Sequence, residues 1–306
     1  AVPVDLDPPS EKTITDTKLS INMCEAGTTH FLNMEGTFTA DTMVVCGYYW
    51  GVDGCDSGGP ILFAAEWEDP KQTQDSLFET VLYMPDDTGY AFVFDNDSLD
   101  LGVGENDDFT IEAFFYVPDL NYENIPVDVI ARKKDTYTFY INFDKDTPDW
   151  IFFELTAAGG GEIILGVELD IQVGWHHVAA VFDNEFTKSE DLMAIFLDGE
   201  RVTSSQEEQF QPDWTPGIPN SFRDLEVGGV VGGSAGFYGY LEEIRLSSVV
   251  RYSGATYTVP TEPFVTDADT RALWHFDETP GSTAFADASS YGNNLIGGDG
   301  AQTYQP

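Results

Sequence analysis

Short apolar segments separated by turn residues are the feature that most restricts the fold of this chain. From about Leu77 onward they recur at close intervals, and nearly all of them end at Gly, Pro, Asn or Asp. Segments of this kind, rich in aromatic and β-branched residues, are typical of β-strands, and their spacing favours a sandwich. No helix of note is required, and no fixed repeat indicates a solenoid or propeller. The predicted strands are 90–94, 109–117, 137–143, 150–155, 162–169, 176–182, 192–197 and 241–246.

The chain of 306 residues is long enough for one large sandwich with an accessory region. Residues 1–20 contain prolines and polar residues with little periodicity, so we expect an extended arm there. Between about 19 and 67, alternating apolar residues predict a small β subregion that contains the cysteines. The predicted domains are therefore an N-terminal arm with this β subregion at 1–76 and a sandwich at 77–306.

Acidic residues far outnumber basic ones, with 54 Asp and Glu against 13 Lys and Arg and a formal net charge of −41. This charge repels phosphate backbones and anionic lipid surfaces, which argues against nucleic acid as a partner. Two compatible explanations stay open. The carboxylates keep the protein soluble in a salty medium, or some of them converge on divalent cations, because Ca²⁺ prefers oxygen ligands.

An extracellular location, or one at a cell or particle surface, is expected. No apolar run approaches the about 20 residues that span a bilayer, so membrane insertion is not expected. The chain begins with Ala1 in place of Met, which is typical of a processed, soluble chain. One disulfide among Cys24, Cys46 and Cys55 would leave one thiol over, and spacing alone does not decide the pairing.

Three strings within the predicted strands carry a family resemblance. Residues 108–117 are DFTIEAFFYV, residues 174–183 are GWHHVAAVFD and are followed by IFLDGERV at 195–202, and residues 239–246 are GYLEEIRL. In this order and spacing they resemble the laminin-G-like, or concanavalin A-like, jelly-roll family, which is related in fold to pentraxins. The resemblance implies an all-β, antiparallel two-sheet jelly-roll sandwich, preceded here by the small N-terminal extension.

The same strings have physical interpretations of their own. Asp198 and Gly199 are suited to the positive φ angles of a type I′ turn, so a tight hairpin is expected there. The large side chain of Trp175 is expected in the sandwich core. His176 and His177 are adjacent on one strand and point to opposite faces, so structural or surface roles are expected in place of shared metal binding.

The C-terminal stretch from Ala272 to Asn294 is rich in turn residues and oxygen-bearing side chains. It resembles a segment that commonly precedes the other strings in family members, whereas here it follows them. Because the chain ends too soon for another domain, we expect this stretch, with Trp274, to close the jelly-roll.

The loop 287–294 is the candidate metal site. Asp287, Asn293 and Asn294, together with turn carbonyls, offer most of the about six to eight oxygens that Ca²⁺ takes. Glu242 or Glu243 would complete the set, and the resemblance implies a calcium ion near this loop with the acidic pair approaching it. The alternative is a plain turn with self-bonded Asn side chains.

Catalysis is not expected. Residues 56–60 are DSGGP, as around the nucleophile of trypsin-like proteases, but too few residues precede Ser57 to hold the remaining machinery. Laminarinase-type glycosidases share the jelly-roll and use paired carboxylates in an E-x-D-x-x-E string. That spacing begins at Glu168 and Asp170, but Val173 replaces the acid/base, so a glycoside hydrolase is a minor alternative.

Two functions from different classes remain. The first is a calcium-supported recognition or adhesion module that binds a glycan or a surface protein, with Trp214, Tyr238 and Tyr291 as candidate stacking residues. The second is a structural subunit of an extracellular filament, sheath, S-layer or virion appendage. Such a subunit would self-assemble by pairing its arm, residues 1–20, with an edge strand of a neighbour.

Overall fold

The computed structural model divides the chain into two compact units, Ala1–Gln74 and Asp75–Pro306. It describes residues 12–14, 31–32, 35–39, 42–50, 60–65, 79–104, 107–118, 125–143, 148–184, 192–202 and 217–306.

The N-terminal unit contains a small antiparallel sheet in which β4 pairs with β2, β3 and β5, and β3 pairs with β1. β1 lies within the residues predicted as an arm and pairs with a strand of the same unit. The rest of the predicted arm and the predicted domain boundary at 76 lie outside the described residues. The strands are β1 (Lys12–Ile14), β2 (Phe31–Leu32), β3 (Glu35–Thr39), β4 (Thr42–Trp50) and β5 (Pro60–Ala65).

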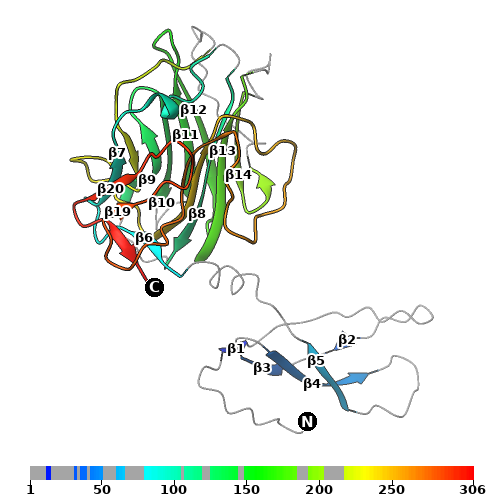
Figure 1. Cartoon of the computed structure of the whole chain (residues 1–306). Helices are drawn as coiled ribbons and strands as arrows, with labels where there is room; N and C mark the ends of the chain where they lie inside the picture. Colours follow the sequence, from blue (N-terminus) through cyan, green and yellow to red (C-terminus); the bar gives the residue numbers. More distant parts are fainter. Residues whose placement is uncertain are drawn as a thin grey trace. The chain divides into compact units, whose positions relative to one another are not determined.

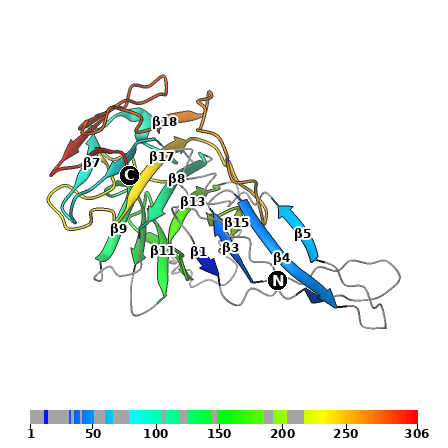
Figure 2. The same cartoon turned by 90° about the horizontal axis from the view of Figure 1, so that it is seen from below.

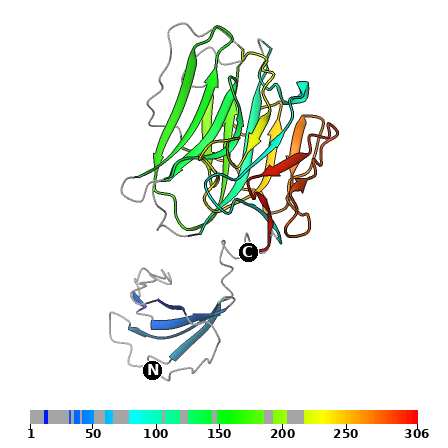
Figure 3. The same ribbon diagram turned by 90° about the vertical axis from the view of Figure 1, so that its left-hand side faces the viewer.

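The larger unit is a sandwich of two antiparallel sheets, which confirms the predicted fold class (Figures 1 and 2). The sheet that faces the viewer in Figure 3 is called the open sheet, and its strand order is β12-β11-β10-β9-β16-β7-β20-β19. Its strands are β7 (Tyr90–Val93), β9 (Ile125–Lys133), β10 (Tyr137–Phe143), β11 (Asp149–Thr156), β12 (Glu162–Leu169), β16 (Leu225–Val227), β19 (Ala284–Phe285) and β20 (Leu295–Gly298).

The other sheet, called the covered sheet, has the order β15-β14-β13-β8-β17-β6-β21, with β18 paired to β17. No helix among the described residues is long and apolar enough to cross a membrane. A single 3₁₀ turn among them, η1 (Asp97–Leu99), follows β7. The strands of the covered sheet are β6 (Val81–Tyr83), β8 (Phe109–Val117), β13 (Gly174–Phe182), β14 (Met193–Leu197), β15 (Glu200–Arg201), β17 (Tyr240–Ser247), β18 (Thr270–Trp274) and β21 (Gln302–Tyr304).

Apolar and polar residues alternate along the central strands of the open sheet. In β10, Phe139 and Ile141 are buried and the residues between them are partly exposed, and β11 follows the same pattern. Because successive side chains of a strand point to opposite faces, this alternation buries one face of the sheet. On that face the ring of Phe109 meets those of Phe153 at 5.8 Å and Phe182 at 5.4 Å between centroids, inside the inter-sheet core.

The covered sheet is buried on both faces. Every residue of β13 is buried, and Tyr116 is the one residue of β8 that is not. The connection from β17 to β18, residues 248–268, lies on its outer face and is called the strap; in Figure 1 it forms the orange loop beside β13 and β14. Tyr252, Tyr257 and Phe264 of the strap pack on buried residues of this face.

Trp175 lies under the strap, so its predicted place in the sandwich core was wrong. Val178, Ala180 and Phe182 face the inter-sheet core, whereas Trp175 packs with Phe264 on the other face. Trp175 is an odd number of residues from the other three, and the period of two therefore sends its side chain to the opposite side.

A buried ionic network holds the strap on the covered sheet. Glu112 of β8 is fully buried, and its carboxylate accepts hydrogen bonds from Arg245 Nε at 2.8 Å and from the Tyr252 hydroxyl at 2.5 Å. Arg251 Nε lies 3.7 Å from the same carboxylate, and the Arg251 guanidinium also pairs with Asp267 at 2.9 Å. A buried carboxylate is tolerated only when its charge is neutralised and hydrogen-bonded. Arg245 of β17, together with Tyr252 and Arg251 of the strap, meets this requirement for Glu112.

The C-terminal stretch closes the sandwich, as predicted. β18 pairs with β17, and Trp274 is buried in the inter-sheet core, where its Nε1 donates to the Asn293 carbonyl at 2.8 Å. β20 and β21 then pair with β7 and β6, one strand in each sheet. The predicted hairpin is also confirmed, because Asp198 and Gly199 join β14 to β15 with φ of 49° and 91°.

We expect Glu112→Gln to lower the free energy of unfolding at neutral pH by about 3 kcal/mol. Burial, the largest single effect, raises the pKa of Glu112, but the hydrogen bond to His177 and the charge of Arg245 outweigh it and lower the pKa from 4.5 to about 2. Each pKa unit corresponds to about 1.4 kcal/mol. Because the folded-state pKa is depressed, the contribution is present above pH 4.5 and is lost as the pH falls through about 2. Urea unfolding of the full chain across this pH range measures it.

Glu262→Gln is the matched control, because Glu262 is an exposed glutamate of the strap. It should change the free energy of unfolding by less than about 0.5 kcal/mol. Equal losses in both variants, or a difference between wild type and Glu112→Gln that persists at low pH, would show that the network does not stabilise the fold.

Candidate functional site

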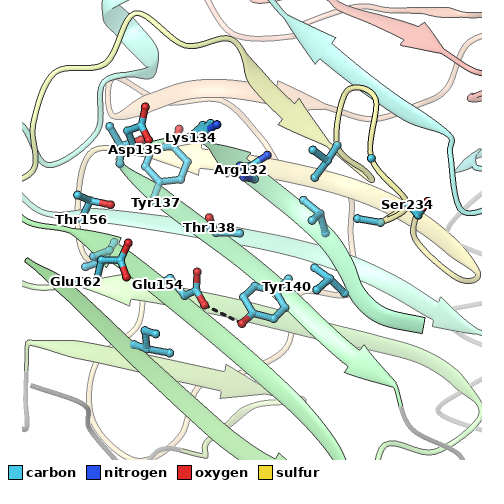
Figure 4. Close-up of a pocket in the computed structure, with 18 residues that line it drawn as sticks. Arg132, Lys134, Asp135, Tyr137, Thr138, Tyr140, Glu154, Thr156, Glu162 and Ser234 are labelled. Atoms are coloured by element: carbon cyan, nitrogen blue, oxygen red, sulfur yellow. Dashed lines mark hydrogen bonds between the residues drawn. The ribbon is translucent and has the colours of Figure 1, made fainter. Parts of the chain in front are cut away.

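The outer face of the open sheet is the sheet surface that the described residues leave uncovered. A pocket of about 560 Å³ lies on this face (Figure 4). Its walls come from strands β9 to β12, the turn 134–136 and a loop at 228–236, here called the flap. This volume is in the range of small-ligand sites, and the site is called the open-face pocket.

Polar side chains at the centre of the open-face pocket are fixed by one another. Glu154 of β11 accepts a hydrogen bond of 2.8 Å from the Tyr140 hydroxyl on β10, as Figure 4 shows. Burial, followed by this bond, raises the pKa of Tyr140 well above its usual range, so its hydroxyl stays protonated and donating. Arg132 of β9 pairs with Glu226 of β16 at 2.8 Å. Lys134, at the end of the pocket, is exposed.

Aromatic rings lie beside this polar centre. Tyr140 and Phe152 are direct neighbours across β10 and β11, with nearly parallel rings 5.0 Å apart, and Trp150 lies 5.6 Å from Phe152. Gly166 of β12 stands opposite Phe152, and a Cβ at Gly166 would lie 2.7 Å from the Phe152 ring. The glycine therefore gives the ring room to lie over the neighbouring strand. All three rings are partly exposed.

This arrangement suits a ligand with apolar faces and hydroxyl groups. Aromatic rings present apolar faces, while a carboxylate and a guanidinium offer acceptors and donors in fixed directions. Pockets that combine a few placed polar groups with aromatic walls are typical of small-molecule and cofactor sites. Sugars have this combination of C–H faces and hydroxyls. None of the residues of the open-face pocket was among the site residues predicted from the sequence.

Tyr291 lines a different pocket, at the rim of the sandwich, with a volume of about 610 Å³. The Arg271 guanidinium lies 5.2 Å from the centre of the Tyr291 ring and hydrogen-bonds its hydroxyl. This rim pocket is strongly acidic. Its carboxylates come from Asp97, Asp100, Asp107, Asp108 and Asp269.

The other predicted stacking residues lie elsewhere. Tyr238 packs against the inter-sheet core, and its backbone N–H donates to Asp128 at 2.6 Å. Trp214, Cys24 and Cys55 lie outside the described residues, as does the side chain of Cys46, so the stacking role of Trp214 and the disulfide stay predictions. Self-assembly through residues 1–20 stays a prediction for the same reason.

The predicted metal ligands of the loop 287–294 hydrogen-bond the loop and the strand β18 beside it. One oxygen of Asp287 accepts from the backbone N–H groups of Leu273 and Ser289 at 2.9 and 2.8 Å, and the other accepts from Asn293 N–H at 2.8 Å. Asn294 Oδ1 accepts from Asp287 N–H at 2.9 Å. These are the contacts of a side-chain-stabilised turn. They engage both Asp287 oxygens and Asn294 Oδ1, whereas Asn293 Oδ1 is buried with no hydrogen-bond partner among the described residues.

Glu242 and Glu243 belong to another group of carboxylates, and no hydrogen bond between described residues joins them to Asp287. Glu243 accepts from His275 Nδ1 at 2.5 Å, which raises the pKa of His275. Glu242 is buried, and its Oε2 has no hydrogen-bond partner among the described residues. Burial, then the charges of Glu243, Asp277 and Glu278, raises the pKa of Glu242 well above its usual value.

No three or more His, Cys, Asp or Glu side chains of the described residues are placed to hold a metal ion. The predicted calcium ligands therefore do not form a ready-made site, and calcium binding stays a prediction. The two histidines have structural contacts, as expected. His176 hydrogen-bonds Asp198 at 2.7 Å and stacks on Phe115, while His177, on the opposite face, contacts Tyr257.

Comparison with known proteins gives one family match. A family model described as "Concanavalin A-like lectin/glucanases superfamily" matches residues 86–254, which is more than half of the chain. No curated protein matches.

Two of the solved structures that are similar to this chain show the range of the similarity. One is a candidate carbohydrate binding protein from Bacteroides ovatus, with 15% identity and a TM-score of 0.49, over 86% of this chain and 68% of that one. The other is a heptameric SAP-like pentraxin from Limulus polyphemus, with 11% identity and a TM-score of 0.31, over 53% of this chain and 77% of that one. Neither similarity bears on what this chain binds.

Asp287→Ala should destabilise the larger unit by about 2 to 4 kcal/mol, with or without calcium. The change leaves three backbone N–H groups without their acceptor, and each unsatisfied group costs about 1–3 kcal/mol when it is buried. Calorimetric unfolding in chelator and in excess Ca²⁺ measures the loss, with the exposed Asp170→Ala as control. A loss that appears only when calcium is present would instead identify Asp287 as a metal ligand.

Proposed function

Because the chain belongs to the concanavalin A-like lectin/glucanases superfamily, as its strand sequences predicted, we propose that it recognises carbohydrate, and that the glycan binds in the open-face pocket. The observation that carries this proposal is the Tyr140 ring beside Glu154 and Arg132 in this pocket, with Phe152 and Trp150 extending the aromatic surface next to it on β11. An extracellular or surface setting is part of the same proposal.

The binding mode follows from the positions of these groups. The Tyr140 ring packs against the C–H face of a sugar, and the remaining lone pairs of Glu154 and the N–H groups of Arg132 hydrogen-bond its hydroxyls. Since Glu154 is already held by Tyr140, and Arg132 by Glu226, few side-chain rotations are lost on binding. Such preorganisation improves affinity without adding contacts.

We propose binding without hydrolysis. Glycoside hydrolysis needs two carboxyl groups on either side of the scissile bond, one of them free to give a proton. In the open-face pocket Glu154 is occupied by the Tyr140 hydroxyl, and Glu162 lies on the edge strand β12. The string that begins at Glu168 still lacks its third carboxylate at Val173. Incubation with a bound glycan should therefore release no new reducing ends.

Tyr140→Ala should weaken glycan binding about tenfold or more, because it removes a stacking ring and releases Glu154 from its fixed position. Tenfold corresponds to about 1.4 kcal/mol, a typical cost for loss of one aromatic contact. A glycan array selects the ligand, and titration calorimetry of the full chain measures its affinity.

Tyr291→Ala is the matched control, because Tyr291 belongs to the rim pocket. Unchanged affinity is expected for this variant. If Tyr291→Ala abolished binding and Tyr140→Ala did not, the glycan site would be the rim pocket, and absence of any glycan ligand would remove carbohydrate recognition altogether.

We propose that any calcium ion is bound by the carboxylates around Glu242. Glu242 Oε2 and Glu278 Oε2 are buried without hydrogen-bond partners among the described residues, and Glu243 and Asp277 act on the same place. Carboxylate oxygens are the ligands that Ca²⁺ prefers. Since the described side chains form no ready-made site, binding requires them to rotate toward the ion.

Millimolar Ca²⁺ should raise the midpoint of thermal unfolding of the wild type and not that of Glu242→Gln. Without calcium, the wild type should become less stable than Glu242→Gln as the pH rises. The pKa of Glu242 is raised in the folded state, so its ionisation at higher pH destabilises the fold, whereas glutamine does not ionise. Scanning calorimetry with Ca²⁺, Mg²⁺ and chelator measures both effects. A wild type that does not respond to Ca²⁺ would remove the ion from the proposal and leave glycan recognition untouched.

A further inference from the structure

One row of outward residues crosses the open sheet from the edge strand β12 to β20. Each residue of the row is the direct partner of the next on the neighbouring strand, so the row runs perpendicular to the strands through the open-face pocket. In order from β12 to β20, its members are Ile164, Glu154, Thr138, Arg132, Glu226, Phe92 and Ile296.

The row is interrupted at Glu226. This residue is only 8% exposed, whereas Ile296 at the end of the row is 43% exposed. One carboxylate oxygen of Glu226 accepts from the backbone N–H of Val231 at 3.0 Å, and the other pairs with Arg132 at 2.8 Å. Because Val231 belongs to the flap, the flap lies over the row at β16.

Hydrogen bonds hold the base of the flap in place. Gly236 N–H donates to the Asp87 carbonyl at 2.8 Å, and Phe237 N–H donates to the Gly228 carbonyl at 2.8 Å. Gly228 N–H in turn donates to Ile130 of β9 at 3.3 Å. The flap is therefore tied to a strand of the open sheet and to the loop before β7.

Glycines make this attachment possible. A Cβ at Gly229 would lie 2.0 Å from the carbonyl oxygen of Gly89, and a Cβ at Gly236 would lie 2.6 Å from that of Asp86. Both distances are far inside van der Waals contact with backbone atoms, so a larger residue at either position would move the flap. The sequence thus specifies a wall in a fixed place.

The flap separates two regions of the face. On one side Val230, Ser234 and Ala235 line the open-face pocket. On the other side Phe92 and the 65% exposed Phe94 form an apolar patch with rings 5.4 Å apart. In the opposite direction the pocket reaches β12, the edge strand, where Glu162 is exposed.

We propose that the open-face pocket takes the end of a glycan chain and not an internal segment. This inference rests on the proposed function and adds the class of ligand. An internal segment that follows the row must leave the pocket across the sheet in both directions, whereas the flap blocks the row at Glu226. The terminal sugar lies against the flap, and the rest of the chain leaves over β12.

Titration calorimetry of the full chain against linear β-1,3-glucan, β-1,4-glucan and β-1,4-mannan oligosaccharides of increasing length tests the proposal. For the series that binds, we expect one protein per chain and the same affinity per chain at every length. Several proteins on each long chain, at the affinity seen with short chains, would overturn chain-end recognition.

Two variants sharpen the test. Phe92 lies beyond the flap, so Phe92→Ala should change the affinity less than twofold at every chain length. A loss of affinity confined to long chains would overturn the proposal. Deleting Val231 and Gly232 should open the flap and raise the number of proteins bound per long chain, provided that short chains still bind as in the wild type. If that variant does not fold, stoichiometry and Phe92→Ala decide alone.

The test distinguishes failure of glycan recognition from failure of chain-end recognition. Absence of any glycan ligand, or a Tyr140→Ala variant that binds as the wild type does, would overturn both proposals. Binding that depends on Tyr140 while its stoichiometry grows with chain length would overturn chain-end recognition alone.

Discussion

The burial of Glu112 is the main constraint on the covered sheet, because this carboxylate needs partners on the outer face of that sheet. An ionised carboxylate in the middle of a strand that is buried on both faces is tolerated only with full neutralisation, and the partners come from Arg245 on β17 and from Arg251 and Tyr252 in the strap. The strap's position on the covered sheet therefore contributes to the neutralisation of Glu112. The open sheet has no such strap among the described residues, and apart from the flap its outer face is open.

The hydrophobic pattern predicted much of this sandwich, and it was least informative where charges face inward. β10 and β11 alternate regularly and were predicted, as were β8, β13 and the hairpin at Asp198. β9 (Ile125–Lys133) was not predicted, and two of its buried residues, Asp128 and Lys133, are charged. In the structure that lysine is fully buried, with Asp95 and Asp100 at 2.6 and 2.9 Å from its Nζ. The two aspartates lie more than thirty residues earlier in the chain, so local sequence cannot show that the charge is compensated.

The candidate site was harder to predict for a different reason. An oxygen-rich loop has the same sequence whether its carboxylate faces a cation or backbone N–H groups, and the sequence does not show the three N–H groups that Asp287 contacts. The open-face pocket, by contrast, is formed by four strands, and their register cannot be read from the sequence. One signal was present: Gly166 interrupts an apolar strand, and glycine inside a strand often marks a place where something approaches closely. Here it is the ring of Phe152.

The flap shows how sequence and fold act together. Its glycines were visible in the sequence, but their purpose depends on the backbone of residues 86–89, which only the folded sheet brings near. A mobile lid would need few contacts at its base, since opening must be inexpensive. The hydrogen bonds of Gly228 and Gly236 and the bond from Val231 to Glu226 argue for a wall that is in place before a ligand arrives. A preformed wall loses little entropy on binding, and it selects ligands by shape: a chain that ends at the flap fits, and a chain that continues must first displace it.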